Sequence, residues 1–320
     1  MISILIPTFR RPDMLRTTVE GCFRQVHGNL KVEIVVVDNC PDASSRKIVA
    51  ELANQNDAFP VRYVHEPRPG VSNARNTAIA SSDGEYLVFL DDDEVPHDQW
   101  LQSLVGALSE NADAAFGPVL PKFEVEPQAQ VRGVARKCFS RDLGLSHGSD
   151  MTHLAAYVGT GNSVFRRHCV VGKSPVFDPR FGLTGGEDTI FIAQLVAEGR
   201  KFAWAADAKV DEFVPADRVV PSYLLTRRFY GGRNRSLSKL HPSMSGALRL
   251  TQWMLVGAAQ VSIFGPFALV LYPFHKALSF ECQARVWGGM GKLLWWRAPS
   301  LQRYGSSEKH SDLADKVDGI

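Results

Sequence analysis

The first 110 residues alternate between short apolar runs and longer stretches whose apolar positions have helical spacing. The apolar runs cover residues 2–6, 32–37, 61–64 and 86–90, and the helical stretches cover residues 12–26, 43–56 and 71–80. This alternation predicts an α/β fold with a doubly wound, Rossmann-like, mostly parallel sheet flanked by helices. Such sheets bind ligands in the crevice beyond the carboxyl ends of their strands. The residues that follow the strands are therefore the candidates for ligand binding and catalysis.

The pattern is less regular beyond residue 110. Residues 114–119 and 155–165 are apolar enough for two further strands, and the polar stretch 121–153 between them is expected to be a loop over the site. An amphipathic helix is predicted over residues 189–198.

Four consecutive acids, Asp91, Asp92, Asp93 and Glu94, follow the apolar run 86–90. Adjacent like charges repel, and carboxylates at a buried strand end are costly unless a cation neutralises them. Mg²⁺ or Mn²⁺ bound by such carboxylates completes its shell with water and substrate phosphates. The motif therefore predicts a divalent metal site for a phosphorylated ligand. The alternative is an acidic first turn of the next helix, although a cap needs one acid and not four.

The other strand ends are polar as well. Pro7-Thr8-Phe9-Arg10-Arg11 follows the first run and Asp38-Asn39 the second. Asp38 is a candidate ligand contact, but Asp is also a common turn former or helix cap, and the two interpretations remain open. Arg75 lies one turn into the helix that follows a Pro-Gly turn, a position suited to an anionic ligand.

The two glycines of Gly185-Gly186-Glu187-Asp188 would let the backbone come close to a ligand before two adjacent acids. An acidic helix start is the plain alternative.

Charge is distributed unevenly along the 320 residues. Residues 1–220 contain 23 basic and 29 acidic side chains, about −6, whereas the remainder carries about +8. The basic third therefore predicts a surface that faces anionic lipid or nucleic acid. Five cysteines without paired spacing fit a reducing compartment. The N-terminus begins at once with a strand and not with a signal peptide, so secretion is not expected.

Residues 253–272 contain no charged side chain and are long enough to cross a bilayer as a helix. Gly265-Pro266 predicts a break, however, and basic residues flank both sides, which a single crossing disfavours. A re-entrant hairpin or an in-plane membrane helix fits better. Phe280, with the Trp-rich segment 287–296, is expected to lie at headgroup depth. A pair of buried helices in a soluble core is the alternative.

Five motifs in order make the chain resemble the family 2 glycosyltransferases of the GT-A fold, in particular bacterial exopolysaccharide enzymes of the succinoglycan type. The motifs are residues 4–11, the strand end at residues 35–39, residues 70–76, residues 89–93 and residues 185–189, followed by Arg227-Arg228-Phe229. The resemblance covers roughly residues 1–230. It implies an inverting, metal-dependent enzyme that uses a nucleotide-sugar donor, most simply a UDP-sugar.

The resemblance also implies roles for individual residues. The nucleotide sugar would be bound by the residues at the strand ends and on the following helix, namely Pro7, Thr8, Arg10, Asp38, Asn39, Arg75, Asp91 and Asp92. Asp91 and Asp93 match the DxD pair that contacts ribose and the Mg²⁺ or Mn²⁺ ion. Asp188 matches the catalytic base, with Glu187 as the second choice.

One departure concerns the metal shell. Relatives commonly carry a His-Glu-Pro-Val-Pro segment whose His can ligate the ion, whereas this chain has Asp211-Glu212-Phe213-Val214-Pro215. Asp also ligates Mg²⁺ and Mn²⁺, so Asp211 is a candidate third ligand. A surface acid at a strand end is the alternative.

The implied acceptor is a polyprenyl-pyrophosphate oligosaccharide at the cytoplasmic face of the bacterial inner membrane. Arg227 and Arg228 are candidates for its pyrophosphate, unless they form a solvated basic face. Membrane lipid is then a partner and nucleic acid is not, because the basic third also contains a long uncharged run. The predicted organisation is a catalytic domain over residues 1–220, a membrane-associating helical region over residues 221–305, and a polar, disordered tail over residues 306–320.

Two other functions would use some of the same residues. A metal-dependent nucleotidyltransferase would also need a nucleotide crevice and clustered acids, but not Asp188 beside an acceptor channel. A membrane-bound nucleotide-sugar binder without catalysis would not need the catalytic acids that this chain retains.

Overall fold

The computed structural model describes residues 1–25, 30–56, 59–172, 174–239 and 244–297. The chain divides into two compact units. Among the described residues, unit 1 comprises Met1–Leu120 and Arg141–Phe213, and unit 2 comprises Pro121–Ser140 and residues 214–297.

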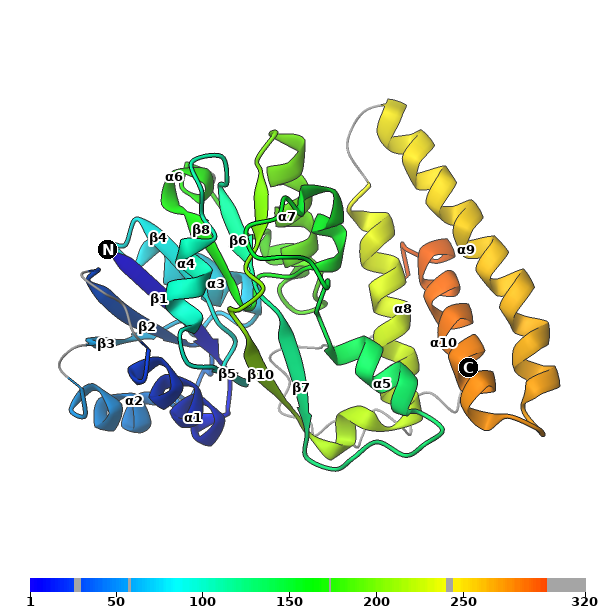
Figure 1. Ribbon diagram of the computed structural model, residues 1–320, viewed down its shortest axis with the longest axis horizontal. Coiled ribbons are helices and arrows are strands. Elements are labelled where there is room, and N and C mark those ends of the chain that lie inside the picture. The colour runs from blue at the N-terminus through cyan, green and yellow to red at the C-terminus, as the bar shows by residue number, and fades with distance from the viewer. Residues whose placement is uncertain (26–29, 57–58, 173, 240–243, 298–320) are drawn as a thin grey trace. The chain divides into compact units, whose positions relative to one another are not determined.

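Unit 1 is built on a seven-stranded sheet with the order β3-β2-β1-β4-β8-β6-β9 (Figure 1). The strands are β1 (Ile2–Thr8), β2 (Val32–Asp38), β3 (Val61–His65), β4 (Tyr86–Phe89), β6 (Ala114–Phe116), β8 (Ser163–Arg166) and β9 (Phe202–Trp204). Only β8 runs antiparallel to its neighbours, and the other pairs are parallel. The predicted mostly parallel sheet and its four N-terminal strands are confirmed.

Helices cover both faces of this sheet because its central strands are apolar on both sides. Ile4 packs in a cluster with Leu15 on one face, whereas Leu5 packs in a second cluster with Ala74 on the other. The helices of unit 1 are α1 (Pro12–Phe23), α2 (Arg46–Ala53), α3 (Val71–Ala80), α4 (Trp100–Gly106), α6 (Arg167–Val170) and α7 (Glu187–Ala197), with short 3₁₀ turns η1 (Thr152–Tyr157) and η2 (Pro179–Phe181).

The segment before β8 is not the strand that its apolar character predicts. Residues 152–157 form the 3₁₀ turn η1, and the strand begins only at Ser163. The buried Asn162 accounts for the irregular backbone between them. Its amide donates to the carbonyls of Pro118 and Ala208 and accepts from the Trp100 indole, so this segment is held by a side chain rather than by strand pairing.

A second sheet has the order β5-β10-β7, formed by β5 (Glu94–Pro96), β10 (Val210–Val214) and β7 (Val119–Phe123). The stretch 121–153, predicted as a loop, therefore begins in a strand and also contains the helix α5 (Arg132–Phe139). The apolar positions Val131, Val134, Ala135 and Phe139 have helical spacing and pack in the core of unit 2.

Unit 2 is helical. Besides α5 it contains η3 (Ala216–Val219), α8 (Pro221–Leu237), α9 (Met244–Leu271) and α10 (Lys276–Leu293), and Figure 1 shows α10 between α8 and α9. Its core joins Val134 and Phe139 of α5, Leu224 of α8, and Phe280 and Ala284 of α10.

Two expectations about unit 2 are wrong. The helix α9 continues through Pro266, because contacts with α10 on both sides of the proline hold it. Phe280 does not lie at a lipid surface. Its side chain is 1% exposed and packs in the core of unit 2, so it cannot contact lipid headgroups as the composition of the segment had suggested. The predicted tail over residues 306–320 lies outside the described residues.

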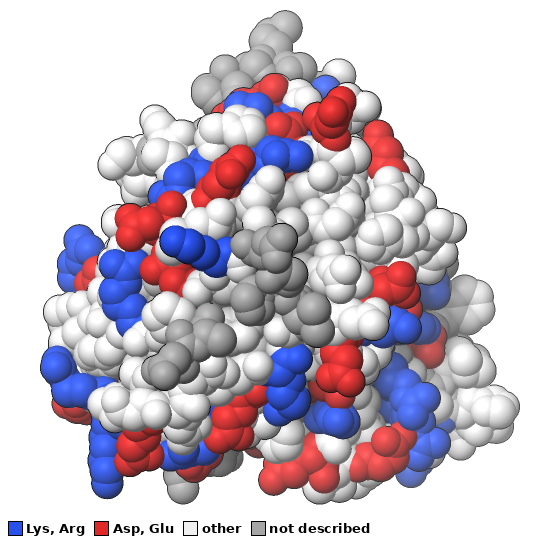
Figure 2. Space-filling view, turned by 60° about the vertical axis from the view of Figure 1, so that its left-hand side comes forward, with Lys and Arg blue, Asp and Glu red and all other residues white. Residues whose placement is uncertain are grey.

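Figure 2 shows one face of the molecule, on which acidic and basic side chains are interspersed rather than gathered by sign. The charge asymmetry along the sequence therefore does not produce a patch of one sign on that face.

Candidate active site

The carboxyl ends of three strands meet at one edge of the main sheet. Thr8 of β1 lies in register with Asp38 of β2, and β4 pairs with β1 on its other side. The acid motif that follows β4 therefore comes next to the polar ends of β1 and β2. Parallel pairing explains this convergence, because it brings the ends of strands distant in sequence to the same edge.

Asp38 and Asn39 shape the loop after β2. The Asp38 carboxylate is fully buried and accepts from the backbone N–H groups of Cys40 and Ser45 at 3.0 and 2.7 Å. The Asn39 amide donates to the carbonyls of Glu66 and Arg68 and accepts from the Gly70 N–H. Both side chains thus hold the turns that lead into α2 and α3, which is the turn-forming role that the sequence left open for Asp38.

The end of β1 contacts the acid motif directly. The Thr8 hydroxyl donates to Asp92 at 2.8 Å, and Arg11 pairs with Asp92 at 3.1 Å and with Asp93 at 2.9 Å. Burial raises the pKa of Asp92 to about 6, against the opposing effect of the Arg11 guanidinium. Arg10 differs from these groups, because its guanidinium pairs with the exposed Asp42. Pro7 lies within β1 opposite Val37.

Arg75 joins the acid motif to the start of α7. Its guanidinium lies 2.5 Å from Glu187 and 3.3 Å from Asp91. The Arg75 and Glu187 side chains are 6% and 3% exposed, whereas the Asp91 side chain is 40% exposed. Glu187 is therefore committed to a buried ion pair, and Asp91 presents its carboxylate to solvent.

Glu94, the fourth acid, lies beside Asp91 in a surplus of negative charge. Its side chain accepts from the Asp91 N–H at 3.0 Å, and the Arg141 guanidinium lies 3.9 Å away. Burial and the charge of Asp91 raise the pKa of Glu94 well above its usual range. Glu212 of β10 lies opposite Glu94 in register and adds to this effect.

Asp188 follows Glu187 in the first turn of α7. Gly185 and Gly186 adopt left-handed backbone conformations, with φ of 76° and 104°, and so direct the chain into the helix. The Oδ1 atom of Asp188 accepts from the Thr189 N–H at 2.6 Å. Within the described part of the chain no donor is recorded for its Oδ2 atom.

The segment Gly159–Gly161 lies between Asp188 and the acid motif. A Cβ atom on Gly159 would lie 2.7 Å from Oδ2 of Asp188 and 3.2 Å from Nη1 of Arg141. A Cβ atom on Gly161 would lie 2.8 Å from Oδ2 of Asp91 and 2.9 Å from Oε1 of Glu94. The two glycines thus leave room for the Asp188 carboxylate on one side and for those of Asp91 and Glu94 on the other.

Arg141, Gly159 and Gly161 are absent from the sequence-based set of site residues. Arg141 donates to the Gly161 carbonyl at 2.6 Å and so fixes the segment between the two groups of acids. Its position in an irregular polar stretch provides no periodic signal. The pair Gly159-Thr160-Gly161 was visible in the sequence, but a short glycine pair without a flanking motif is a weak indication of close backbone approach.

Asp211 lies in β10 in register with Val95, the residue that follows the acid motif. Its carboxylate pairs with His97 at 2.9 Å, and adjacent residues of a strand point to opposite faces. Glu212, its neighbour in β10, is the residue in register with Glu94. Arg227 and Arg228 belong to α8 of unit 2, where the Arg227 guanidinium stacks 4.5 Å from the centre of the Phe139 ring.

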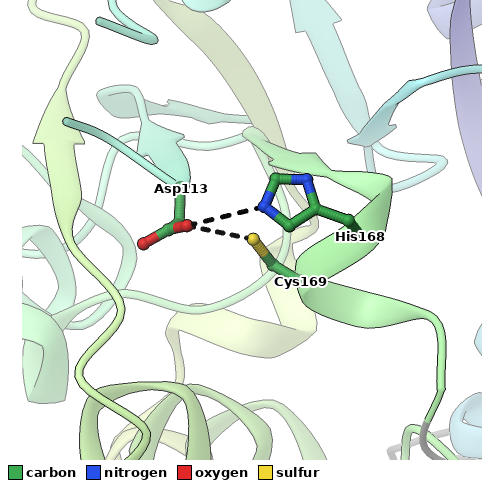
Figure 3. Close-up of side chains that lie close together, drawn as sticks. All are labelled: Asp113, His168 and Cys169. Atoms are coloured by element: carbon green, nitrogen blue, oxygen red, sulfur yellow. Dashed lines mark hydrogen bonds and ion pairs between the residues drawn. The ribbon is translucent and has the colours of Figure 1, made fainter. Parts of the chain in front are cut away.

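One compact group of potential metal ligands occurs elsewhere among the described residues. Asp113, His168 and Cys169 lie where β6 begins and β8 ends, at the opposite edge of the sheet from Asp91 (Figure 3). Asp113 already accepts from Cys169, Arg200 and the Lys201 N–H. Burial and the Asp113 carboxylate raise the pKa of the Cys169 thiol to about 12, which disfavours the thiolate that metals require. Asp113 is therefore accounted for as a structural acceptor.

The acid motif fits a hard divalent cation better. Its donor atoms are carboxylate oxygens, which Mg²⁺ and Mn²⁺ prefer. Glu94 lies beside Asp91 and opposite Glu212, so three carboxylates gather at this point and a cation would relieve their repulsion. Asp93 is paired with Arg11, so it would exchange this partner for the ion.

Comparison with known proteins identifies the family of the chain. Residues 3–168 match the model of the family Glycosyl transferase family 2. The succinoglycan biosynthesis protein ExoM of Rhizobium meliloti is 28% identical over 85% of both chains. A GalNAc(5)-diNAcBac-PP-undecaprenol beta-1,3-glucosyltransferase of Campylobacter jejuni is 23% identical over 60% of this chain and 58% of its own.

Among solved structures, the mannosyltransferase PcManGT of Pyrobaculum calidifontis, in complex with GDP-Man and Mn²⁺, superposes with a TM-score of 0.56. It covers 93% of this chain and 88% of its own at 15% identity, a similarity that concerns the fold. The family match spans more than half of the chain and includes all of the strand ends described above. The chain therefore belongs to glycosyl transferase family 2, and its unit 1 has the GT-A fold.

Proposed function

We propose that the protein is an inverting transferase that moves a sugar from a nucleotide-sugar donor, a UDP-sugar, to a hydroxyl group of a lipid-linked oligosaccharide. The observation that carries this proposal is the arrangement around Gly159–Gly161, where Asp188 faces one glycine and Asp91 faces the other. An in-line displacement at a sugar carbon needs a base near the attacking hydroxyl and a metal site near the leaving phosphate. Asp188 and Asp91 lie on either side of this short segment, as such a reaction requires.

Asp188 is the proposed catalytic base. Its Oδ2 atom would accept the proton of the acceptor hydroxyl as the acceptor oxygen bonds to the anomeric carbon. The bond between that carbon and the donor phosphate oxygen breaks at the same time, and its electron pair leaves with the nucleoside diphosphate. Attack from the opposite face inverts the anomeric configuration. Glu187, held in its ion pair with Arg75, would position α7 rather than take the proton.

Asp91 and Asp93 are the proposed ligands of Mg²⁺ or Mn²⁺. When bound, such an ion would stabilise the charge that develops on the leaving diphosphate. Asp211 would have to leave His97 to become a third ligand.

The nucleotide of the donor would lie along the carboxyl edge of β1 and β2. Thr8 and Asp92 form a hydrogen-bonded pair at this edge, and Asp38 and Asn39 build the loop beside it. Pro7 and Arg10 belong to the same strand end. In this proposal Asp38 and Asn39 act by shaping the nucleotide site.

The acceptor class is inferred from relatives and from charge. The Campylobacter relative is named for an undecaprenyl-diphosphate substrate, and ExoM for succinoglycan biosynthesis. Arg227 and Arg228 are the proposed contacts for the pyrophosphate of such an acceptor. The proposed location is the cytoplasmic face of the bacterial inner membrane, with membrane lipid rather than nucleic acid as a partner.

Calorimetric titration with a panel of UDP-, GDP- and dTDP-sugars in the presence of Mn²⁺ tests the donor site. One sugar nucleotide is expected to bind, with binding lost when the metal is omitted or in Asp93→Ala. Because Asp142 is exposed and outside the acid motif, Asp142→Ala serves as the matched control and should bind normally. If no donor binds, with or without metal, the transferase proposal is wrong.

Replacing Gly161 with alanine should weaken donor binding by about tenfold or more, equivalent to about 1.4 kcal/mol. The new methyl group would lie within 2.9 Å of both Asp91 and Glu94 and push the two carboxylates out of place. Gly106→Ala is the control, because nothing lies within 4 Å of its Cβ position. Equal donor affinity in the two variants would show that Gly161 does not face the donor.

A further inference from the structure

The helix α9 has two different sides, although it carries no charged residue from Trp253 to Leu271. Its inner side packs against α10, with Gly257 and Ala268 buried. Its outer side is exposed and consists of large aliphatic and aromatic residues at helical spacing: Leu248, Leu255, Ile263, Phe267 and Val270 are 63%, 65%, 53%, 55% and 64% exposed. The segment Gly246–Leu271 is long and apolar enough to cross a membrane, yet few of its residues are buried.

The helix α10 is antiparallel to α9 and keeps its polar groups in protein contacts along the length of the pair. The Ser279 hydroxyl donates to the Ala268 carbonyl at 2.7 Å, and the Lys292 ammonium donates to the Gln260 side chain at 2.7 Å. The Arg285 guanidinium stacks 4.5 Å from the centre of the Phe264 ring. These contacts tie the C-terminal half of α9, from Gln260 to Ala268, to α10.

The far side of α10 is held by the rest of unit 2. Phe280 belongs to the core formed with α5 and α8, Glu281 pairs with Lys137 of α5 at 3.1 Å, and the Ser236 hydroxyl of α8 donates to the Lys292 carbonyl. If α9 crossed a bilayer, these contacts would draw Glu281, Arg285 and Lys292 into the hydrocarbon with it. Charged side chains in that position are costly, so crossing is disfavoured.

We infer that α9 lies in the plane of a lipid bilayer, with its outer side immersed at the boundary of headgroups and acyl chains and α10 behind it on the protein side. Charge complementarity favours a bilayer over a protein as the occupant. Residues 221–297 contain ten Lys and Arg against one acid, Glu281, and Arg249 and Lys276 flank the uncharged stretch at its two ends. Basic residues at both ends of an apolar helix face suit anionic headgroups around an in-plane helix.

This inference deepens the proposed function, because it identifies the surface that would bring the enzyme to a lipid-linked acceptor. It also separates α9 from α10, which the sequence treated as one membrane-associating region. The exposed Tyr272 and Phe274, 56% and 78% exposed, extend the same apolar surface past the end of α9.

Flotation of the full chain with vesicles tests the surface. The protein is expected to float with vesicles of phosphatidylcholine and phosphatidylglycerol, and the double variant Leu255→Glu/Phe267→Glu should reduce the bound fraction at least about tenfold. Val171→Glu, at a valine of unit 1 that is 50% exposed, is the matched control and should float like the wild type. No flotation of the wild type, or equal flotation of the double variant, would overturn the inference.

Depth measurements separate an in-plane helix from a crossing one. Nitroxide labels placed singly at Leu255, Ile263 and Val270 should report one common depth in the bilayer, because all three lie on the outer side. A steady change in depth from Leu255 to Val270 would contradict the in-plane arrangement. The labelled variants are first checked for wild-type thermal unfolding.

The same preparations distinguish this inference from the proposed function. The double variant should bind the nucleotide sugar like the wild type, since its substitutions lie outside unit 1. Flotation without donor binding in the wild type would reject the transferase proposal alone. Donor binding without flotation would reject the membrane surface alone.

Discussion

Asp188→Asn is expected to lower the rate of sugar transfer about 10²- to 10⁴-fold, the usual contribution of a positioned general base, while donor affinity stays close to that of the wild type. Asparagine has the same shape and can accept a hydrogen bond from the Thr189 N–H through its side-chain oxygen. It cannot take up the proton of the acceptor hydroxyl. The substitution therefore removes proton transfer and leaves the start of α7 in place.

Transfer is measured with a labelled nucleotide sugar and a lipid-linked acceptor, and donor binding by calorimetry on the same preparations. Glu198→Gln at the far end of α7 is the matched control, since it makes the same chemical change away from Gly159. Wild-type transfer by Asp188→Asn would exclude Asp188 as the base. Parallel loss of donor binding would indicate that Asp188 holds the donor instead.

Arg75→Ala should destabilise unit 1 by about 3–5 kcal/mol, the typical cost of removing one partner of a buried ion pair. Glu187 is 3% exposed, so its carboxylate would be left in a site that excludes water and has lost its main cation. The same substitution releases Asp91 from Arg75. Transfer activity should therefore fall further than the loss of stability alone explains.

Urea unfolding measures this effect, and Arg180→Ala provides the control. Arg180 pairs with Asp178 at 2.6 Å, but its side chain is 84% exposed, so its loss should leave the stability close to that of the wild type. The double variant Arg75→Met/Glu187→Met should recover much of the stability without recovering activity. Similar costs for Arg75→Ala and Arg180→Ala would contradict the assignment of a buried pair.

The sequence was most informative at strand ends. The apolar runs that became β1, β2 and β4 are continuous, because both faces of the sheet are covered by helices, and a continuous run can be recognised without knowledge of its neighbours. The polar residues that follow each run must then lie at the carboxyl edge of the sheet. Thr8, Asp38 and the acid motif could be grouped in advance for this reason.

The sequence was least informative where side chains, rather than periodicity, hold the backbone. Asn162 fixes the irregular segment that carries Gly159 and Gly161 through three hydrogen bonds to distant residues. Pro266 is a helix breaker by its local chemistry, yet α9 continues through it because α10 holds both sides. In both cases contacts between residues that are far apart in the chain, and not local propensity, decided the backbone conformation.

The sequence by itself determined the class of fold, the order of the strands and helices in the first 110 residues, and the resemblance to a family of glycosyltransferases, because these depend on residue type and on short-range spacing. Only the tertiary structure decided which residue or helix of two neighbours is buried and which is exposed. It buried Glu187 against Arg75 and left an oxygen of Asp188 beside Gly159, and it placed α10 in the protein while exposing α9. Adjacent residues share a sequence context, but which of them loses its water depends on what packs against each, and that is decided only when the chain is folded.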